Sequence, residues 1–330
     1  MKGIYFSLAA VLTAILVMIC GLLITGRTDA GDSQKEQIPR YHIQVITKNA
    51  NEHFWTTFKS GAANAGKQAN VYVEFVNIAA DSLNSSLIAL EKAVYSGVDG
   101  IAFQAQDVEK TEALVKKAQD KKIALLTYEN DQNYLTDVPT VGSNSYDIGF
   151  REGKMGIRAC GGKGRVAIIL NGNVSGAKGQ NKNLKLQGMI DAFSNYSTVK
   201  VQEIYSLGSG MFKTEKLMSM ILAKQPKIDL VLCTDERSTP GIAQVLVDEN
   251  KVGVVSIVGY GAMPQTLNYI ERGVIYGSIC PDAYHIGYNC VKQLVTILDG
   301  ERISDSINTD LFSIDLSNVK QYQVIDNEKD

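Results

Sequence analysis

Continuous apolar runs alternate with amphipathic segments from residue 42 to residue 299, and this alternation constrains the fold more than any other feature of the sequence. Residues 166–170 contain only Val, Ala, Ile and Leu, which is typical of a parallel strand buried on both faces. Residues 82–96 instead place Leu83, Leu87 and Leu90 at helical spacing, so that one face of a helix is apolar. Strands that alternate with helices in this way predict right-handed βαβ units and a doubly wound parallel sheet.

The alternating pattern occurs twice along the chain. The first half is expected to contain strands at 42–47, 71–77, 99–103, 122–127 and 138–142, with helices at 52–69, 82–96 and 108–121. The second half is expected to contain strands at 165–170, 199–205, 228–233, 254–259 and 274–279, with helices at 180–194, 212–224, 238–250 and 263–271. Segment 143–164, with a helix at 147–159, should cross between the halves. A helix at 283–299 and two strand-like stretches at 307–315 and 320–325 close the chain.

This arrangement predicts an α/β protein of two similar lobes joined by a three-crossover hinge. The N-terminal lobe is expected to comprise residues 41–145 and 283–306, and the C-terminal lobe residues 146–282 and 307–325. Two such lobes face each other across a cleft at the ends of their strands, where a ligand can bind and the hinge can close.

The first residues form a separate segment. Gly3 to Gly26 includes no charged residue, and Lys2 and Arg27 flank it. The apolar core of a secretory signal takes roughly 7–15 residues, whereas spanning a bilayer takes about 20. No Ala-x-Ala cleavage site follows the run. The pattern therefore favours an uncleaved membrane anchor at 1–26 over a cleaved signal, a polar stalk at 27–40, and a binding domain outside the cytoplasm.

Composition excludes some classes of function. The net charge of −2 gives no positive field for nucleic acid. Apart from Cys20 in the apolar run, the cysteines are Cys160, Cys233, Cys280 and Cys290, with no Cys-x-x-Cys pair and no histidine at metal-ligand spacing. The sequence therefore predicts neither a metal nor a cofactor, and leaves open a disulfide between Cys280 and Cys290.

No catalytic motif is complete. Glycines at 208–210 and 172–179 follow strands but lack the remaining residues of a dinucleotide or phosphate loop. The chain has no Gly-x-Ser-x-Gly and no His-Glu-x-x-His, and its three histidines form no set with a nucleophile. The chain is therefore predicted not to be an enzyme.

Polar and aromatic residues do recur just past the ends of the predicted strands. Trp55, the only tryptophan, lies off the expected apolar stripe of helix 52–69, which comprises Phe54, Phe58, Ala62, Ala65 and Ala69. Trp55 is therefore expected either to contact a ligand or to pack the rim of the sheet. The polar residues at strand ends are Lys48, Gln104, Gln106, Glu129, Asn130, Asn171, Asn183, Thr234, Asp235, Glu236, Arg237 and Asp282.

Amides, carboxylates and a cation beside an aromatic face suit a neutral, polyhydroxylated ligand, because each hydroxyl both donates and accepts hydrogen bonds. The alternative for any one of these residues is a solvated loop group or a helix cap. Asp235 in particular could simply cap helix 238–250.

Residues 41–325 resemble the class I periplasmic solute-binding proteins of the ribose/galactose type. The residues that carry the resemblance are Phe54, Trp55 and Gly61; Asp99 to Ile101; Val141 to Asn144 with Gly149; Leu232 to Asp235 with Gly241; Ile257 to Tyr260; and Ile286 with Gly287. The resemblance implies the type I periplasmic-binding-protein fold and a role as the sugar-binding subunit of an ABC transporter.

By the same resemblance, Phe54 and Trp55 match the aromatic pair that stacks on the sugar. Lys48, Gln104, Glu129 and Asn130 match polar contacts of the first lobe, and Asn183 and Asp235 match those of the second. The sequence departs from the family pattern at three positions, where Asn183, Gly261 and Pro281 replace Arg, Asp and Gln respectively. These departures argue against ribose as the ligand.

The resemblance and the apolar N-terminal run together give two hypotheses. The first is a sugar-binding protein that serves an ABC permease. The alternative is a membrane-anchored co-receptor that reports sugar occupancy to a membrane histidine kinase. Cleavage of the N-terminal segment favours the first, and a retained helix favours the second.

Overall fold

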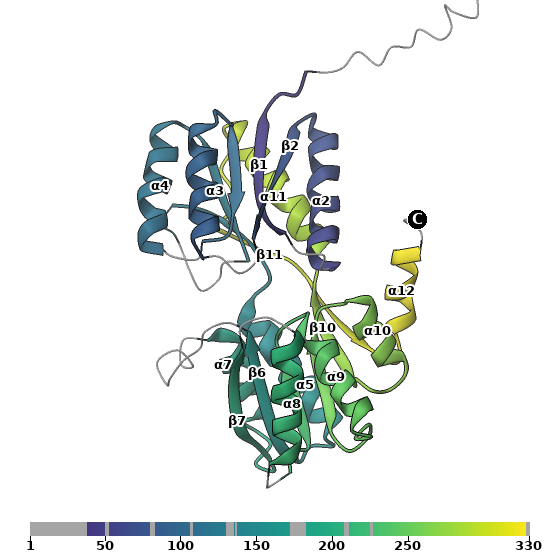
Figure 1. Ribbon diagram of the computed structural model, residues 1–330. Helices are drawn as coiled ribbons and strands as arrows, with labels where there is room; N and C mark the ends of the chain where they lie inside the picture. Colours follow the sequence, from purple (N-terminus) through teal and green to yellow (C-terminus); the bar gives the residue numbers. More distant parts are fainter. Residues whose placement is uncertain are drawn as a thin grey trace, which may run out of the picture. The chain divides into compact units, whose positions relative to one another are not determined.

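Two six-stranded sheets, each covered by helices on both faces, organise the chain in the computed structural model (Figure 1). The structure describes residues 38–49, 53–79, 83–105, 108–129, 135, 137–171, 183–207, 211–224 and 227–327. The predicted anchor and most of the predicted stalk lie outside these residues. Among the helices that the structure describes, none has the length and apolar character needed to cross a membrane.

The first sheet has the strand order β11-β5-β4-β3-β1-β2, and all of its paired strands are parallel. Its strands are β1 (His42–Asn49), β2 (Tyr72–Ala79), β3 (Gly100–Phe103), β4 (Ala124–Tyr128), β5 (Thr140–Gly142) and β11 (Ser306–Asn308). The helices of this lobe are α2 (His53–Ala69), α3 (Leu83–Tyr95), α4 (Val108–Asp120) and α11 (Ala283–Leu298).

The second sheet has the equivalent order β12-β10-β9-β8-β6-β7, and only β12 is antiparallel to its neighbour. Its strands are β6 (Gly164–Asn171), β7 (Val199–Leu207), β8 (Leu230–Cys233), β9 (Ser256–Tyr260), β10 (Gly277–Pro281) and β12 (Leu311–Asp315). The helices are α5 (Ser145–Ala159), α7 (Leu184–Phe193), α8 (Met211–Ala223), α9 (Ser238–Asp248), α10 (Pro264–Glu271) and α12 (Val319–Asn327).

Alternating residues of the strands supply a separate core to each face of each sheet. In β4, Leu126 packs in the core shared with α2 and α11, whereas Leu125 packs in the core shared with α3 and α4. In β6, Ile168 packs in the core shared with α5 and α7, and Ile169 packs in the core shared with α8 and α9. The predicted doubly wound, parallel-dominated α/β fold is confirmed.

Within the described residues, the chain passes between the two sheets at three places. These are the step from β5 to α5, the step from β10 to α11, and the step from β11 to β12 (Figure 1). The stretch 307–315, expected as one strand, is therefore two strands in different sheets. Residues 306–308 pair with β5 of the first sheet, and residues 311–315 pair with β10 of the second.

The expectation of a strand at 320–325 was wrong, because this segment lies in α12. Val319 is fully buried, and Tyr322, three residues later, packs on Phe312. A spacing of three places both side chains on one face of a helix, whereas a strand would direct them to opposite faces.

Candidate ligand-binding site

The carboxyl ends of adjacent strands in the first sheet bring together three of the predicted residues. Lys48 is near the end of β1, Gln104 follows β3, and Glu129 follows β4. All three are partly buried. Asn130, predicted beside them, lies outside the described residues.

Glu129 is hydrogen-bonded to β5 and to the connection between β5 and α5. Its backbone N–H donates to the carbonyl of Val141 over 2.9 Å, and its Oε1 accepts a hydrogen bond from the backbone N–H of Ser143 over 2.7 Å. The residue adopts φ of +49°, a conformation that is uncommon outside glycine. The carboxylate is therefore oriented by the segment that leads into α5.

Of the two aromatic residues at the start of α2, Trp55 is the more enclosed, which favours packing, one of the two roles expected for it. Trp55 is only 4% exposed, and its ring contacts Phe54, Phe58 and Tyr128 at centroid distances of 5.0, 5.8 and 6.2 Å. Phe54 is the half-buried member of the pair. The expectation that Trp55 falls off the apolar stripe was wrong, because Trp55, Phe58 and Ala62 follow the three- and four-residue spacing of one helix face.

In the second lobe, Asp235 connects the ends of two strands. Its Oδ1 accepts hydrogen bonds from the backbone N–H and the Oγ of Ser238, over 2.8 and 2.5 Å. Its Oδ2 accepts a hydrogen bond from Nδ2 of Asn171, over 2.9 Å. Asp235 therefore stabilises the first turn of α9, as its capping alternative predicted, and also orients the amide at the end of β6.

Asn183 and Asp282 are N-caps. Oδ1 of Asn183 accepts from the backbone N–H of Leu186 over 3.0 Å, at the start of α7. Oδ1 of Asp282 accepts from the backbone N–H of His285 over 3.1 Å, and its Oδ2 lies 2.6 Å from Nδ1 of the same histidine. Each side chain has a structural partner at the same sheet edge where a ligand contact was predicted.

Three charged or aromatic groups at this edge were not among the ligand contacts predicted from the sequence. Tyr260 ends β9, and Nζ of Lys185 lies 4.2 Å from the centroid of its ring. Glu236 follows Asp235 and is 7% exposed. Glu236 was already among the polar residues noted after strand 228–233, and the position of Tyr260 at the end of an apolar strand was a signal that could have identified it. Lys185, in the first turn of α7, had no such signal.

Electrostatic effects connect Tyr260 with both lobes. Burial raises the pKa of Tyr260 well above its ordinary value, and the negative charge of Glu129 raises it further, as does that of Glu236. Glu129 belongs to the first lobe and Glu236 to the second. Charges from the edges of both sheets therefore act on the same ring.

The described part of the chain shows no cluster of three His, Cys, Asp or Glu residues that could hold a metal ion. Its four cysteines, Cys160, Cys233, Cys280 and Cys290, are free thiols. The disulfide that the sequence left open between Cys280 and Cys290 is therefore not formed in the structure.

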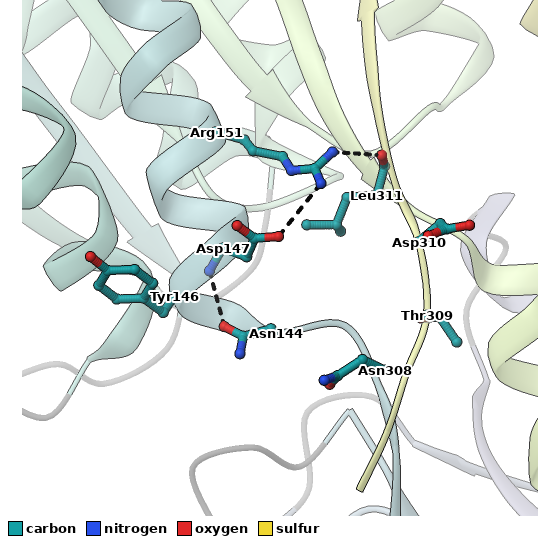
Figure 2. Close-up of a pocket in the computed structure, with 8 residues that line it drawn as sticks. All are labelled: Asn144, Tyr146, Asp147, Arg151, Asn308, Thr309, Asp310 and Leu311. Atoms are coloured by element: carbon teal, nitrogen blue, oxygen red, sulfur yellow. Dashed lines mark hydrogen bonds and ion pairs between the residues drawn. The ribbon is translucent and has the colours of Figure 1, made fainter.

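A polar cavity of about 370 Å³ lies at two of the crossings (Figure 2). Arg151 of α5 donates to the carbonyl of Leu311 over 3.0 Å and approaches Asp147 at 3.5 Å. This guanidinium ties α5 to the segment between β11 and β12. The cavity lining consists of Asn144, Tyr146, Asp147, Arg151, Asn308, Thr309, Asp310 and Leu311, and it includes none of the predicted site residues.

Solved structures match this architecture. The chain superposes on the glucose-galactose binding protein GanP from Geobacillus stearothermophilus with a TM-score of 0.77 and 25% identity, covering 84% of this chain and 98% of that one. It matches the XylFII–LytSN complex with a TM-score of 0.74 and 23% identity, covering 84% of this chain and 98% of that one.

Two curated relatives align over 76% of the chain. The D-allose-binding periplasmic protein of Escherichia coli K12 is 22% identical over 260 residues, which is 82% of that protein. The D-ribose/D-allose-binding protein of Pseudomonas aeruginosa is 24% identical over 261 residues, which is 78% of that protein. Residues 43–302 match the family described as "Periplasmic binding protein domain". The chain therefore belongs to the periplasmic binding protein domain family, as the resemblance in its sequence predicted.

Proposed function

We propose that this chain is an extracytoplasmic solute-binding protein that binds a sugar reversibly between its two lobes and presents it to an ABC transporter. The observation that carries the proposal is the gathering of polar and aromatic side chains at the carboxyl ends of the strands in both sheets. Open α/β sheets bind their ligands at this edge. The names of the two curated relatives, which refer to D-allose and D-ribose, favour a sugar as the ligand.

The hydrogen-bonding groups at these edges are already oriented. Ser143 holds Glu129, and Ser238 and Asn171 hold Asp235. Oriented acceptors lose little side-chain entropy when a hydroxyl binds, so they favour affinity for a polyhydroxylated ligand. The half-buried ring of Phe54 would supply the apolar surface for the C–H face of the sugar.

Closure of the lobes requires only that the sugar bind the closed form more tightly than the open form. Lys48, Gln104, Glu129 and Asn130 would contact the sugar from the first lobe, and Asn183, Asp235 and Asp282 from the second. No bond is made or broken in this process, so the protein would not act as an enzyme.

The test is a titration of the purified full chain, in a mild detergent, with D-allose, D-ribose, D-galactose, D-glucose, D-arabinose and D-xylose. Trp55 is the only tryptophan, so a change in its emission would report on the first lobe. A sugar at about 100 times its Kd should stabilise the fold by roughly 2.7 kcal/mol and raise the melting temperature. Mass spectrometry should recover the sugar unchanged. If none of the six sugars changes emission or melting temperature, the sugar assignment is wrong.

A second role for the same binding site is a membrane-anchored co-receptor for a histidine kinase. Two observations favour it. Residues 3–26 include no charged residue and are long enough to span a bilayer. One of the similar solved structures is the complex of XylFII with LytSN.

Cell fractionation and N-terminal mass analysis separate the two roles. A retained N-terminus in the membrane fraction, together with sugar-dependent co-purification of a histidine kinase, would favour the co-receptor. A soluble chain that lacks about the first 30 residues, with sugar uptake lost when its gene is deleted, would favour the transporter.

A further inference from the structure

Gly261, directly after β9, has no room for a side chain. Its φ is +82°, and two hydrogen bonds to β10 hold this conformation. The backbone N–H of Gly261 donates to the carbonyl of Ile279 over 2.9 Å, and its carbonyl accepts from Oγ of Ser278 over 2.6 Å. A Cβ on Gly261 would lie 2.5 Å from Cγ of Glu236 and 2.8 Å from both Cδ and Oε1 of Glu236. The Glu236 side chain therefore occupies the place that a side chain at position 261 would take.

Glu236 reaches this place from the end of a different strand. It belongs to the connection between β8 and α9, which Asp235 orders by accepting hydrogen bonds from Ser238 and Thr239. From there its Oε1 accepts from the backbone N–H of Ala262 over 3.3 Å. The backbone of Glu236 therefore lies just after β8, and its carboxylate lies at the end of β9.

The surroundings of Glu236 belong to the candidate site. Burial raises the pKa of Tyr260, at the end of β9, and that of the Cys280 thiol, in β10, and the negative charge of Glu236 raises both further. Asp282 also raises the pKa of Cys280. Contacts place Glu236 at this site: its side chain lies against Gly261, which directly follows Tyr260 and is hydrogen-bonded to Ser278 and Ile279 of β10.

We propose that Glu236 is a specificity-determining residue of the sugar site, whose carboxylate accepts hydrogen bonds from sugar hydroxyls at the carboxyl end of β9. The inference rests on the proposed function and deepens it. A carboxylate that enters from β8 meets the ligand from a different direction than one attached at position 261. It therefore selects neutral aldoses by the orientation of the hydroxyls on that side of the ring.

The test compares the wild-type full chain with Glu236→Gln and Glu236→Ala by isothermal titration calorimetry. The probes are the six sugars named above and the monodeoxy derivatives of the sugar that binds the wild type most tightly. Glu236→Gln should lower the affinity for that sugar by about 10-fold or more, because a hydrogen bond to a charged acceptor becomes one to a neutral acceptor. Glu249→Gln, an exposed carboxyl at the other end of α9, is the matched control and should bind as the wild type does.

The deoxy derivatives separate ligand contact from structural support. In the wild type, removing the hydroxyl that contacts Glu236 should weaken binding about 10-fold or more. In Glu236→Gln the same removal should weaken binding clearly less, because only the weaker hydrogen bond to a neutral acceptor is lost. A melting temperature of Glu236→Gln close to that of the wild type would show that the fold is kept. If Glu236→Ala fails to fold, the near-isosteric Gln variant carries the comparison.

Two results would overturn the inference while leaving the proposed function intact. One is unchanged affinity in Glu236→Gln. The other is weaker binding by Glu236→Gln in which removing each hydroxyl costs as much affinity as it does in the wild type. Glu236 would then affect binding only by supporting the structure of the site, without contacting the sugar. Failure of the wild type to bind any of the six sugars would instead overturn the proposed function, and the inference with it.

Discussion

Gly61 of α2 lies against the backbone carbonyl of Tyr284 in α11, and a Cβ built on Gly61 would be 2.0 Å from that oxygen. The contact is reciprocal, because a Cβ on Gly287 would be 2.0 Å from the carbonyl oxygen of Phe58. The two helices therefore meet backbone to backbone over the first sheet, which side chains larger than hydrogen would prevent.

The second lobe repeats this contact between α5 and α7. A Cβ on Gly149 would lie 1.8 Å from the carbonyl oxygen of Lys185, and one on Gly188 would lie 2.1 Å from that of Tyr146. In all four helices the glycine follows the contacted carbonyl by three residues. The similarity of the lobes thus extends from strand order to individual helix contacts.

Gly61→Ala is expected to destabilise the protein. Alanine gains about 1 kcal/mol over glycine in helix propensity. Against this, overpacking costs about 1–3 kcal/mol, and a carbonyl at 2.0 Å is backbone and cannot rotate away. Urea unfolding should therefore show a net loss. Ala63→Ser also adds one heavy atom to α2, but on its exposed face, and should change the free energy of unfolding by less than about 0.5 kcal/mol. A Gly61→Ala variant as stable as the wild type would contradict the close contact.

Substitutions of Trp55 and of Phe54 should have different effects, the first mainly on stability and the second mainly on sugar binding. Trp55 is nearly fully buried among aromatic rings, so Trp55→Ala should cost about 3–5 kcal/mol of unfolding free energy. Phe54 is half-buried, so Phe54→Ala should cost less unfolding free energy than Trp55→Ala. It should, however, lower the affinity for the best-binding sugar by about 10-fold. Thermal unfolding and calorimetric titration of both variants test this. The opposite pattern, with Trp55→Ala folded as stably as the wild type but unable to bind, would restore Trp55 as the ligand-stacking ring.

Glu152 predicts a dependence of stability on pH. The side chain is fully buried in α5, and neither carboxyl oxygen has a hydrogen-bond partner among the described residues. Burial raises its pKa from 4.5 to about 8, although the charge of Lys185 opposes the shift. Between these values the unfolded chain releases a proton that the folded chain keeps. The free energy of unfolding should therefore fall as the pH rises from about 4.5 to 8.

Glu152→Met should reduce this fall. It removes a carboxyl that must stay protonated, so it should stabilise the protein by about 1–4 kcal/mol at pH 8 and by less at pH 5. Glu112→Gln, on the exposed face of α4, should leave the profile unchanged. Chemical unfolding at half-unit pH steps measures the effect. Superimposable wild-type and Glu152→Met profiles would show that the Glu152 carboxyl does not control this dependence.

Asp235 and Asn171 should behave as a coupled pair. Asp235→Ala leaves the N–H of Ser238 and the amide of Asn171 without their acceptor, at a cost of about 1–3 kcal/mol. Asn171→Ala alone should cost less, and the double variant should cost less than the sum of the single ones. Asp120→Ala, exposed at the end of α4, serves as the control. Strict additivity in a double-mutant cycle would argue against the Asp235–Asn171 hydrogen bond.

Much of the fold could be predicted from local pattern. Buried strands such as 166–170 and helices such as 82–96 differ in hydrophobic period, and this period depends only on neighbouring residues. The capping role of Asp235 was also foreseeable, because a cap contacts residues only three positions away. Local pattern was insufficient for Trp55, since the same helix allowed two descriptions of its apolar face. It also failed for α12, whose assignment depends on packing against Phe312.

The amino-acid order by itself determined the succession of strands and helices, the division into two similar lobes, and the presence of polar residues after successive strands, because all of these depend on short-range periodicity. Only the tertiary structure decided that Trp55 is enclosed, that Gly61 meets Tyr284, and that Glu236 fills the space beside Gly261. Each of these relationships joins separate elements, and hydrophobic periodicity within one element holds no information about the neighbours that folding brings to it.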